Sequence, residues 1–138
     1  MTELRRLNGE LAVAGQINPS DIPALAAEGF RAIICNRPDG EAPGQPKYQE
    51  IESVASANGI KTVYQPVVAS DIGGDTAANF DHIVGELPKP LLVYCRSGMR
   101  STALWALSQV GKQPVTDIVK QAAAAGYDIR QFLPRHTK

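Results

Sequence analysis

The chain has 138 residues, enough for one domain that buries roughly two thirds of the surface its unfolded form would expose. Fourteen Lys and Arg residues balance fourteen Asp and Glu residues, which argues against a broad electrostatic field that would recruit nucleic acid or an anionic membrane. We find no apolar leader, no run long enough to span a bilayer and only two cysteines, so we expect one cytoplasmic domain over residues 1–138.

The first elements along the chain are predicted to be an edge hairpin and a short helix. Residues 4–7 and 10–14 flank Asn8-Gly9, a pair that fits the two-residue type I′ turn. A helix is expected over residues 22–28, with Gly29 as its stop signal. The hairpin is expected to lie at the edge of a larger sheet.

Strands and helices alternate through the rest of the chain. Apolar or alternating runs predict strands over 30–35, 60–68 and the segment that ends before Cys95, the middle one as a core strand. Helical patterns follow at 47–57, after the loop 69–75, at 101–107 and at 115–125. This order indicates a three-layer α/β fold: a central, mostly parallel sheet of about four to five strands with helices on both faces.

The stretch from Cys95 to Ser101 joins an expected strand to an expected helix through a tight turn. One thiol, one glycine and two arginines lie within six residues, and the backbone N–H groups there turn toward the start of the helix. Such a turn is an anion cradle, and its positive charge favours the ionised form of the thiol. Cys95 is therefore a candidate nucleophile, and a merely buried cysteine would leave the arginines and the glycine unexplained. The expected anion-binding residues are Arg96, Ser97, Gly98, Met99, Arg100 and Ser101.

Ligands of parallel sheets bind at the carboxyl ends of the strands, where residues 35–37, 68–71 and 95–100 are expected to meet. Arg100 is the candidate for bidentate recognition of an oxyanion, while Arg96 is expected at the rim. Asp71 is a candidate general acid if its loop folds over the cradle, and a solvated loop residue otherwise. Asp75 is expected to cap the next helix, and Ser101 either to cap its own helix or to donate a hydrogen bond to the sulfur of Cys95.

Cys35 and the histidines are the remaining candidates for site chemistry. Cys35 is by default a small buried side chain, and alternatively a redox partner that forms a disulfide with Cys95. Neither His82 nor His136 has the neighbours of a metal ligand, so we expect no metal and no cofactor.

Three separated motifs resemble one bacterial family. Gln16-Ile17-Asn18-Pro19, the stretch from Ile34 to Glu41 and the Cys95 to Ser101 loop are similar to β-lactamase-hydrolase-like proteins with a phosphatase-like domain. In some bacteria this domain is fused to a persulfide dioxygenase of the metallo-β-lactamase type. The resemblance implies a fold like that of cysteine-dependent dual-specificity phosphatases. Related phosphatases also carry a cysteine at the position of Cys35 that pairs with the nucleophile.

The Cys95 loop departs from the phosphatase pattern that the resemblance implies. Such phosphatases place five residues between the cysteine and the arginine and a histidine before the cysteine, whereas here four residues separate Cys95 from Arg100 and Tyr94 precedes. The shorter loop resembles that of rhodanese sulfurtransferases, in which a small ring suits a terminal sulfur.

These observations leave three functional hypotheses. The first is a sulfurtransferase that carries sulfane sulfur from thiosulfate or a persulfide as a Cys95 persulfide, with a small anionic sulfur donor and a persulfide dioxygenase as a possible partner. The alternative is a phosphatase that forms a phosphocysteine at Cys95 from a phosphate ester, with Asp71 protonating the leaving oxygen. The third is a thiol redox sensor that uses Cys35 and Cys95. None of the three requires nucleic acid or a membrane as a partner.

Overall fold

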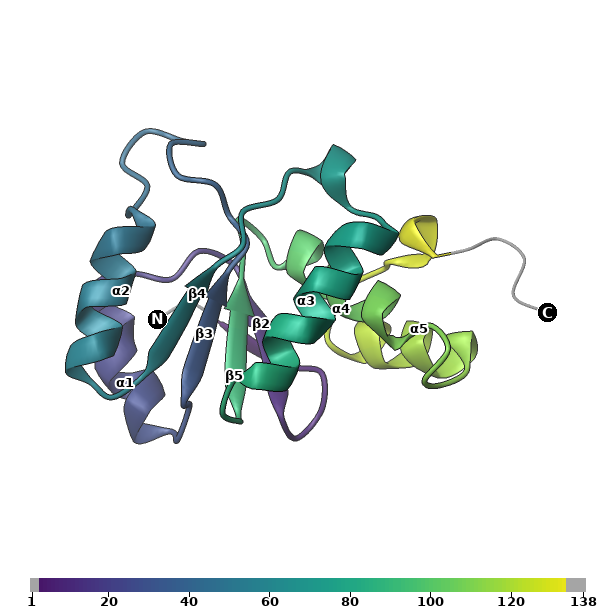
Figure 1. Cartoon of the computed structure of the whole chain (residues 1–138), viewed down its shortest axis with the longest axis horizontal. Helices are drawn as coiled ribbons and strands as arrows, with labels where there is room; N and C mark the ends of the chain where they lie inside the picture. Colours follow the sequence, from purple (N-terminus) through teal and green to yellow (C-terminus); the bar gives the residue numbers. More distant parts are fainter. Residues whose placement is uncertain (1–2, 134–138) are drawn as a thin grey trace.

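A computed structural model describes residues 3–133 of the chain. Its centre is a five-stranded sheet in the order β1-β2-β5-β3-β4, in which β1 is antiparallel and all other neighbours are parallel. Helices cover both faces of the sheet (Figure 1). The strands are β1 Leu4–Arg6, β2 Leu11–Ala14, β3 Ala32–Cys35, β4 Lys61–Tyr64 and β5 Leu91–Tyr94. The three-layer α/β prediction is confirmed, with the N-terminal hairpin at the sheet edge.

The three inner strands β2, β5 and β3 are buried along their whole length, as expected for parallel strands that are covered on both faces. In the sheet register Tyr94 lies between Ala14 and Cys35, so the three strands end at the same level. The residues that follow them, Gly15, Asn36 and Cys95, are consequently brought to one edge of the sheet.

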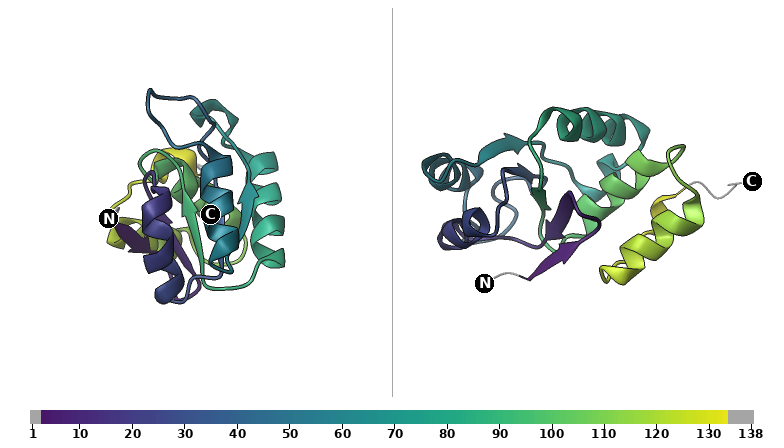
Figure 2. Two further views of the ribbon diagram at one scale, coloured as in Figure 1. Left: turned by 90° about the vertical axis from the view of Figure 1, so that its left-hand side faces the viewer. Right: turned by 90° about the horizontal axis from the view of Figure 1, so that it is seen from below.

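Two hydrophobic cores hold the layers together, and Figure 2 shows the helices on either side of the strands. On one face α1 Ile22–Ala27 and α2 Tyr48–Ala57 pack against side chains such as Ile33 and Leu92. On the other face α3 Gly74–Glu86, α4 Met99–Gln109 and α5 Val115–Ala124 enclose Val93 and Trp105. Short 3₁₀ turns occur at η1 Pro19–Asp21, η2 Ala69–Asp71 and η3 Arg130–Phe132. No helix among residues 3–133 is long and apolar enough to cross a membrane.

The predicted type I′ turn of the hairpin is wrong. Four residues, 7–10, separate β1 from β2, and neither Asn8 nor Gly9 has the positive φ that this turn requires. The side-chain oxygen of Asn8 instead accepts the N–H groups of Glu10 and Leu11 at 2.8 and 3.0 Å. Asn8 thus directs the turn through its side chain rather than through a left-handed backbone.

Two further expectations need correction. The strand predicted over 60–68 is the four-residue edge strand β4, and its side chains are half-buried or exposed rather than part of the core. Beyond it the N–H groups of Gln65 and Val67 still bond to the carbonyls of Cys35 and Asn36, which accounts for the longer extended pattern. The start of α3 is capped by Thr76, whose hydroxyl accepts the N–H of Gly73 at 3.0 Å, and not by Asp75.

Candidate active site

Cys95 is the first residue after β5, at the carboxyl edge of the sheet. Its N–H donates to the carbonyl of Ala14 at 3.3 Å, and its sulfur accepts the N–H of Gly98 at 3.1 Å. Gly98 has a φ of +94°, which turns the loop back over the sulfur. Cys95 is fully buried, yet a backbone amide points at its sulfur. One amide of the loop thus faces the sulfur, and the binding of an anion by the loop stays a prediction.

The entrance of the loop depends on Gly15, which follows β2. The carbonyl of Arg96 accepts the N–H of Gln16 at 3.2 Å, and a Cβ on Gly15 would lie 2.8 Å from that carbonyl oxygen. Any larger residue would therefore push the cradle away from β2. Sequence reasoning missed Gly15, and the signal was a glycine placed directly after an expected strand at the edge that carries the site.

Arg100 is held by two partners on one side of its guanidinium group. Its Nη1 donates to Oε2 of Glu41 and to the carbonyl of Val67, both at 2.8 Å, and its Nη2 donates to Oε1 of Glu41 at 2.8 Å. A guanidinium has five N–H groups. Three of them are used here, so the Nε–H and one Nη2–H remain as a second fork.

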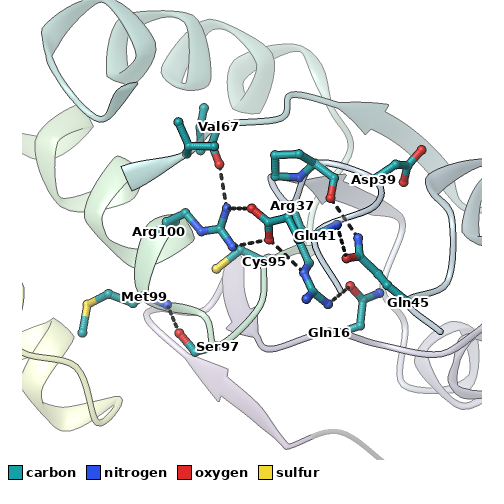
Figure 3. Close-up of polar contacts among 12 residues, drawn as sticks. Gln16, Arg37, Asp39, Glu41, Gln45, Val67, Cys95, Ser97, Met99 and Arg100 are labelled. Carbon is teal, nitrogen blue, oxygen red and sulfur yellow. Dashed lines mark hydrogen bonds and ion pairs between the residues drawn. The ribbon is translucent and has the colours of Figure 1, made fainter. Parts of the chain in front are cut away.

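Figure 3 shows the sulfur of Cys95 on the side of Arg100 that faces away from Val67. The contact with Glu41 and the neighbouring Cys95 thiol both raise the pKa of Arg100 above its ordinary value. Arg100 thus binds the Glu41 carboxylate end-on, and its remaining fork faces the thiol. Arg100 and the Gly98 amide both present donors on the side of the sulfur, and the recognition of an oxyanion there stays a prediction.

Glu41 lies between two guanidinium groups. Its Oε1 also accepts the Nε–H of Arg37 at 3.0 Å, and Arg37 is itself buried and bonded to the side chain of Gln16 at 3.1 Å. The hydrogen bonds from Arg100 and Arg37 hold the pKa of Glu41 below its ordinary range. Sequence reasoning gave Glu41 no role, although an acidic residue four positions after Arg37 in a loop at the site edge was a usable signal.

Ser101 neither caps α4 nor donates a hydrogen bond to the sulfur of Cys95, so both of these predicted roles are wrong. Its hydroxyl donates to Oδ1 of Asn36 at 2.9 Å, and the Nδ2 of Asn36 donates to the carbonyl of Gln65 at 2.9 Å. Ser101 and Asn36 are both fully buried. Ser101 therefore ties the start of α4 to the loops after β3 and β4, and its hydroxyl is committed to Asn36 rather than to the sulfur.

The other predicted loop residues lie around the cradle. Arg96 and Ser97 are exposed at the rim, and the N–H of Met99 donates to the hydroxyl of Ser97 at 3.3 Å. Asp71 is exposed on η2, and its carboxylate accepts the N–H of Val68 at 3.3 Å. Its role as general acid stays a prediction.

Cys35 and Cys95 are both free, buried thiols in this structure. The Cys35 thiol donates to the carbonyl of Arg37 at 3.3 Å and has the hydroxyl of Tyr94 as a hydrogen-bonding neighbour. Burial raises the pKa of Cys35 to about 11, so this thiol stays protonated near neutral pH. Its disulfide with Cys95 stays a prediction. His82 is exposed and pairs with Glu86 at 3.3 Å, whereas His136 lies outside the described residues.

Known proteins are related to this chain by sequence or by structure. A β-lactamase hydrolase-like protein of Agrobacterium fabrum is 34% identical over 126 residues, which are 90% of this chain and 29% of that protein. A crystal structure from Neisseria meningitidis, described as a candidate phosphatase, is 33% identical, with a TM-score of 0.85 over 93% of this chain and 92% of the other. The P. aeruginosa protein TpbA in complex with pTyr shares the fold at 12% identity, with a TM-score of 0.66 over 91% of this chain and 75% of the other.

The chain spans less than a third of the length of the curated relatives it matches. The family model of the β-lactamase hydrolase-like protein, phosphatase-like domain, matches residues 3–112, which include the sheet, the Cys95 loop and α4. The chain therefore belongs to the family of phosphatase-like domains of β-lactamase hydrolase-like proteins.

Proposed function

We propose that this domain is a phosphatase that hydrolyses phosphate monoesters through a phosphocysteine at Cys95. One observation carries the proposal: the Gly98 amide and the remaining fork of Arg100 both face the sulfur of Cys95. Both groups suit the oxygens of a phosphoryl group next to the attacking sulfur. The phosphatase-like fold of the family supports the same reaction.

The reaction has two steps. In the first, the Cys95 thiolate attacks phosphorus, the bond from phosphorus to the leaving oxygen breaks, and that oxygen takes a proton from Asp71. In the second, water attacks the phosphocysteine, gives a proton to the Asp71 carboxylate and releases phosphate and the free thiolate. Arg100 and the loop amides hold the phosphoryl oxygens in both steps, because charge develops there.

Access to the sulfur requires movement. Cys95 has no exposed surface, and the Arg100–Glu41 pair lies beside it (Figure 3). A substrate must therefore displace side chains at the mouth of the cradle. Its phosphate compensates for this disturbance because it offers Arg100 a second anionic partner next to Glu41.

Sulfur transfer is the competing reaction. The four-residue spacing between Cys95 and Arg100 favours it, while the family and the fold favour phosphate chemistry. The two reactions modify Cys95 in different ways. A sulfane donor adds one sulfur atom, whereas a phosphate ester adds a phosphoryl group and releases its alcohol.

The deciding experiment incubates the protein separately with an aryl phosphate and with thiosulfate or glutathione persulfide. Phenol release and intact mass are recorded for the wild type and for Cys95→Ser. Turnover of the aryl phosphate that Cys95→Ser abolishes supports the phosphatase. A stable added sulfur on Cys95 without turnover of the aryl phosphate would refute it and restore the sulfurtransferase hypothesis.

A further inference from the structure

Tyr127 reaches the Cys95 loop from a part of the chain outside the family match. It follows α5 and lies beyond residue 112, where the family model ends. Its hydroxyl donates to the carbonyl of Ser97 at 3.0 Å. The backbone N–H of Tyr127 donates to Ala122 at 2.9 Å and so fixes the residue to the end of α5.

The carbonyl of Ser97 and the N–H of Gly98 belong to one planar peptide unit. In a trans peptide these two groups point in opposite directions, so fixing one end fixes the other. The carbonyl is held by Tyr127, and the N–H points at the sulfur of Cys95 at 3.1 Å. The hydroxyl of Tyr127 is thus linked to the cradle through a single rigid unit.

Without that link the peptide unit can turn over. Gly98 populates positive and negative φ with similar ease, so little in its own backbone opposes rotation of the preceding peptide. The ring of Tyr127 also packs on Gly98: a Cβ there would lie 2.2 Å from the hydroxyl oxygen and 2.8 Å from Cζ. The loop and the tyrosine are therefore fitted to each other.

We propose that Tyr127 is a positioning residue that keeps the Gly98 N–H directed at the Cys95 sulfur, where it stabilises the thiolate and then a phosphoryl oxygen. The stabilisation of a phosphoryl oxygen rests on the proposed phosphatase function. Burial and the nearby Cys95 raise the pKa of Tyr127, which keeps its hydroxyl protonated as a donor. A tyrosine outside the family match thereby acts on the reaction through the backbone alone.

The test compares Tyr127→Phe with the wild type. The variant keeps the ring that packs on Gly98 and removes only the hydroxyl. The ultraviolet absorbance of the Cys95 thiolate is followed against pH, with Cys95→Ser subtracted, and kcat/KM is measured with an aryl phosphate. We expect the thiolate titration to move to higher pH by about 0.5 to 1 unit and kcat/KM to fall roughly three- to tenfold, because one amide donor is lost.

The matched control is Tyr48→Phe. Tyr48 is also partly buried, and its hydroxyl donates to Thr62, on the other face of the sheet, at 2.9 Å. We expect its thiolate titration to equal that of the wild type, which would show that loss of a tyrosine hydroxyl as such does not move it.

The outcomes separate this proposal from the proposed function. A Tyr127→Phe protein whose thiolate titrates as in the wild type overturns the positioning role. If the wild type does not turn over aryl phosphate but the titration of Tyr127→Phe still moves, phosphatase function fails while the role of Tyr127 toward the sulfur stands.

Discussion

Glu41 is the counter-charge for two guanidinium groups, and its protonation state sets how firmly they are held. Arg100 and Arg37 lower its pKa below the ordinary value of 4.5, so the folded protein binds fewer protons there than the unfolded chain. The stability that Glu41 contributes is fully present at pH values above its ordinary pKa and is lost as pH falls through its lowered pKa. We expect Glu41→Gln to be less stable by about 1.5 to 3 kcal/mol at neutral pH, because it loses charged hydrogen bonds to both arginines.

Urea unfolding of both proteins across the acid range measures this effect. The difference in unfolding free energy between the wild type and Glu41→Gln should shrink as pH falls below about 4.5, because Glu41 is then protonated, whereas the other acidic groups titrate in both proteins and cancel in the difference. Glu3→Gln is the control: its ion pair with Arg5 is exposed and should contribute little. Equal stability of Glu41→Gln and the wild type at neutral pH would contradict the prediction.

The proposed role of Asp71, the transfer of one proton, can also be tested by changing a single side chain. If Asp71 protonates the leaving oxygen, Asp71→Asn should lower kcat/KM by about a hundredfold for an alkyl phosphate and far less for a nitrophenyl phosphate, whose leaving group needs no proton. The measurement is kcat/KM, which reports the first step alone, across a series of leaving groups. Equal losses for good and poor leaving groups would exclude Asp71 as the acid of the first step, and Asp75→Asn, on α3 beyond the η2 turn, is the matched control.

At the scale of the elements, the site depends on a buried connection between α4 and the loops after β3 and β4. Ser101 donates to Asn36, and Asn36 donates to Gln65. Ser101→Ala leaves the buried Oδ1 of Asn36 without this donor, so we expect a loss of about 1 to 3 kcal/mol in unfolding free energy. Denaturant unfolding measures it. Ser53→Ala, at an exposed position of α2, should change stability little, and an equally small effect of Ser101→Ala would show that the connection is dispensable.

The elements themselves were largely predictable because breakers and periodicity mark them. Gly29, Gly126 and the apolar runs of β3 and β5 delimit their elements locally, and the order of strand, turn and helix around Cys95 follows from the same signals. The errors arose where a side chain decided the backbone geometry. Asn8 makes its turn through its own carboxamide, and Thr76 caps α3 from inside the helix.

The side-chain partners in the site were less predictable than its candidate nucleophile, Cys95. The pairing of Glu41 with Arg100 joins residues 59 positions apart, and the contact of Tyr127 with Ser97 joins residues 30 apart. No local pattern encodes such contacts, because they depend on how two loops meet at the sheet edge. Cys95 and Arg100, in contrast, lie in one continuous turn whose chemistry is visible in the sequence.

For the whole molecule, the position of β5 between β2 and β3 has a consequence for hydrogen exchange. Amides of Leu91–Tyr94 should exchange only when the entire domain unfolds, whereas those of Lys61–Tyr64 at the edge should exchange through local opening. Deuterium uptake followed by mass spectrometry tests this, and equal uptake by the two segments would contradict it. The sulfur of Cys95, the proposed nucleophile, would then directly follow the slowest-exchanging strand, and motions of the exposed loops around it would leave that strand intact.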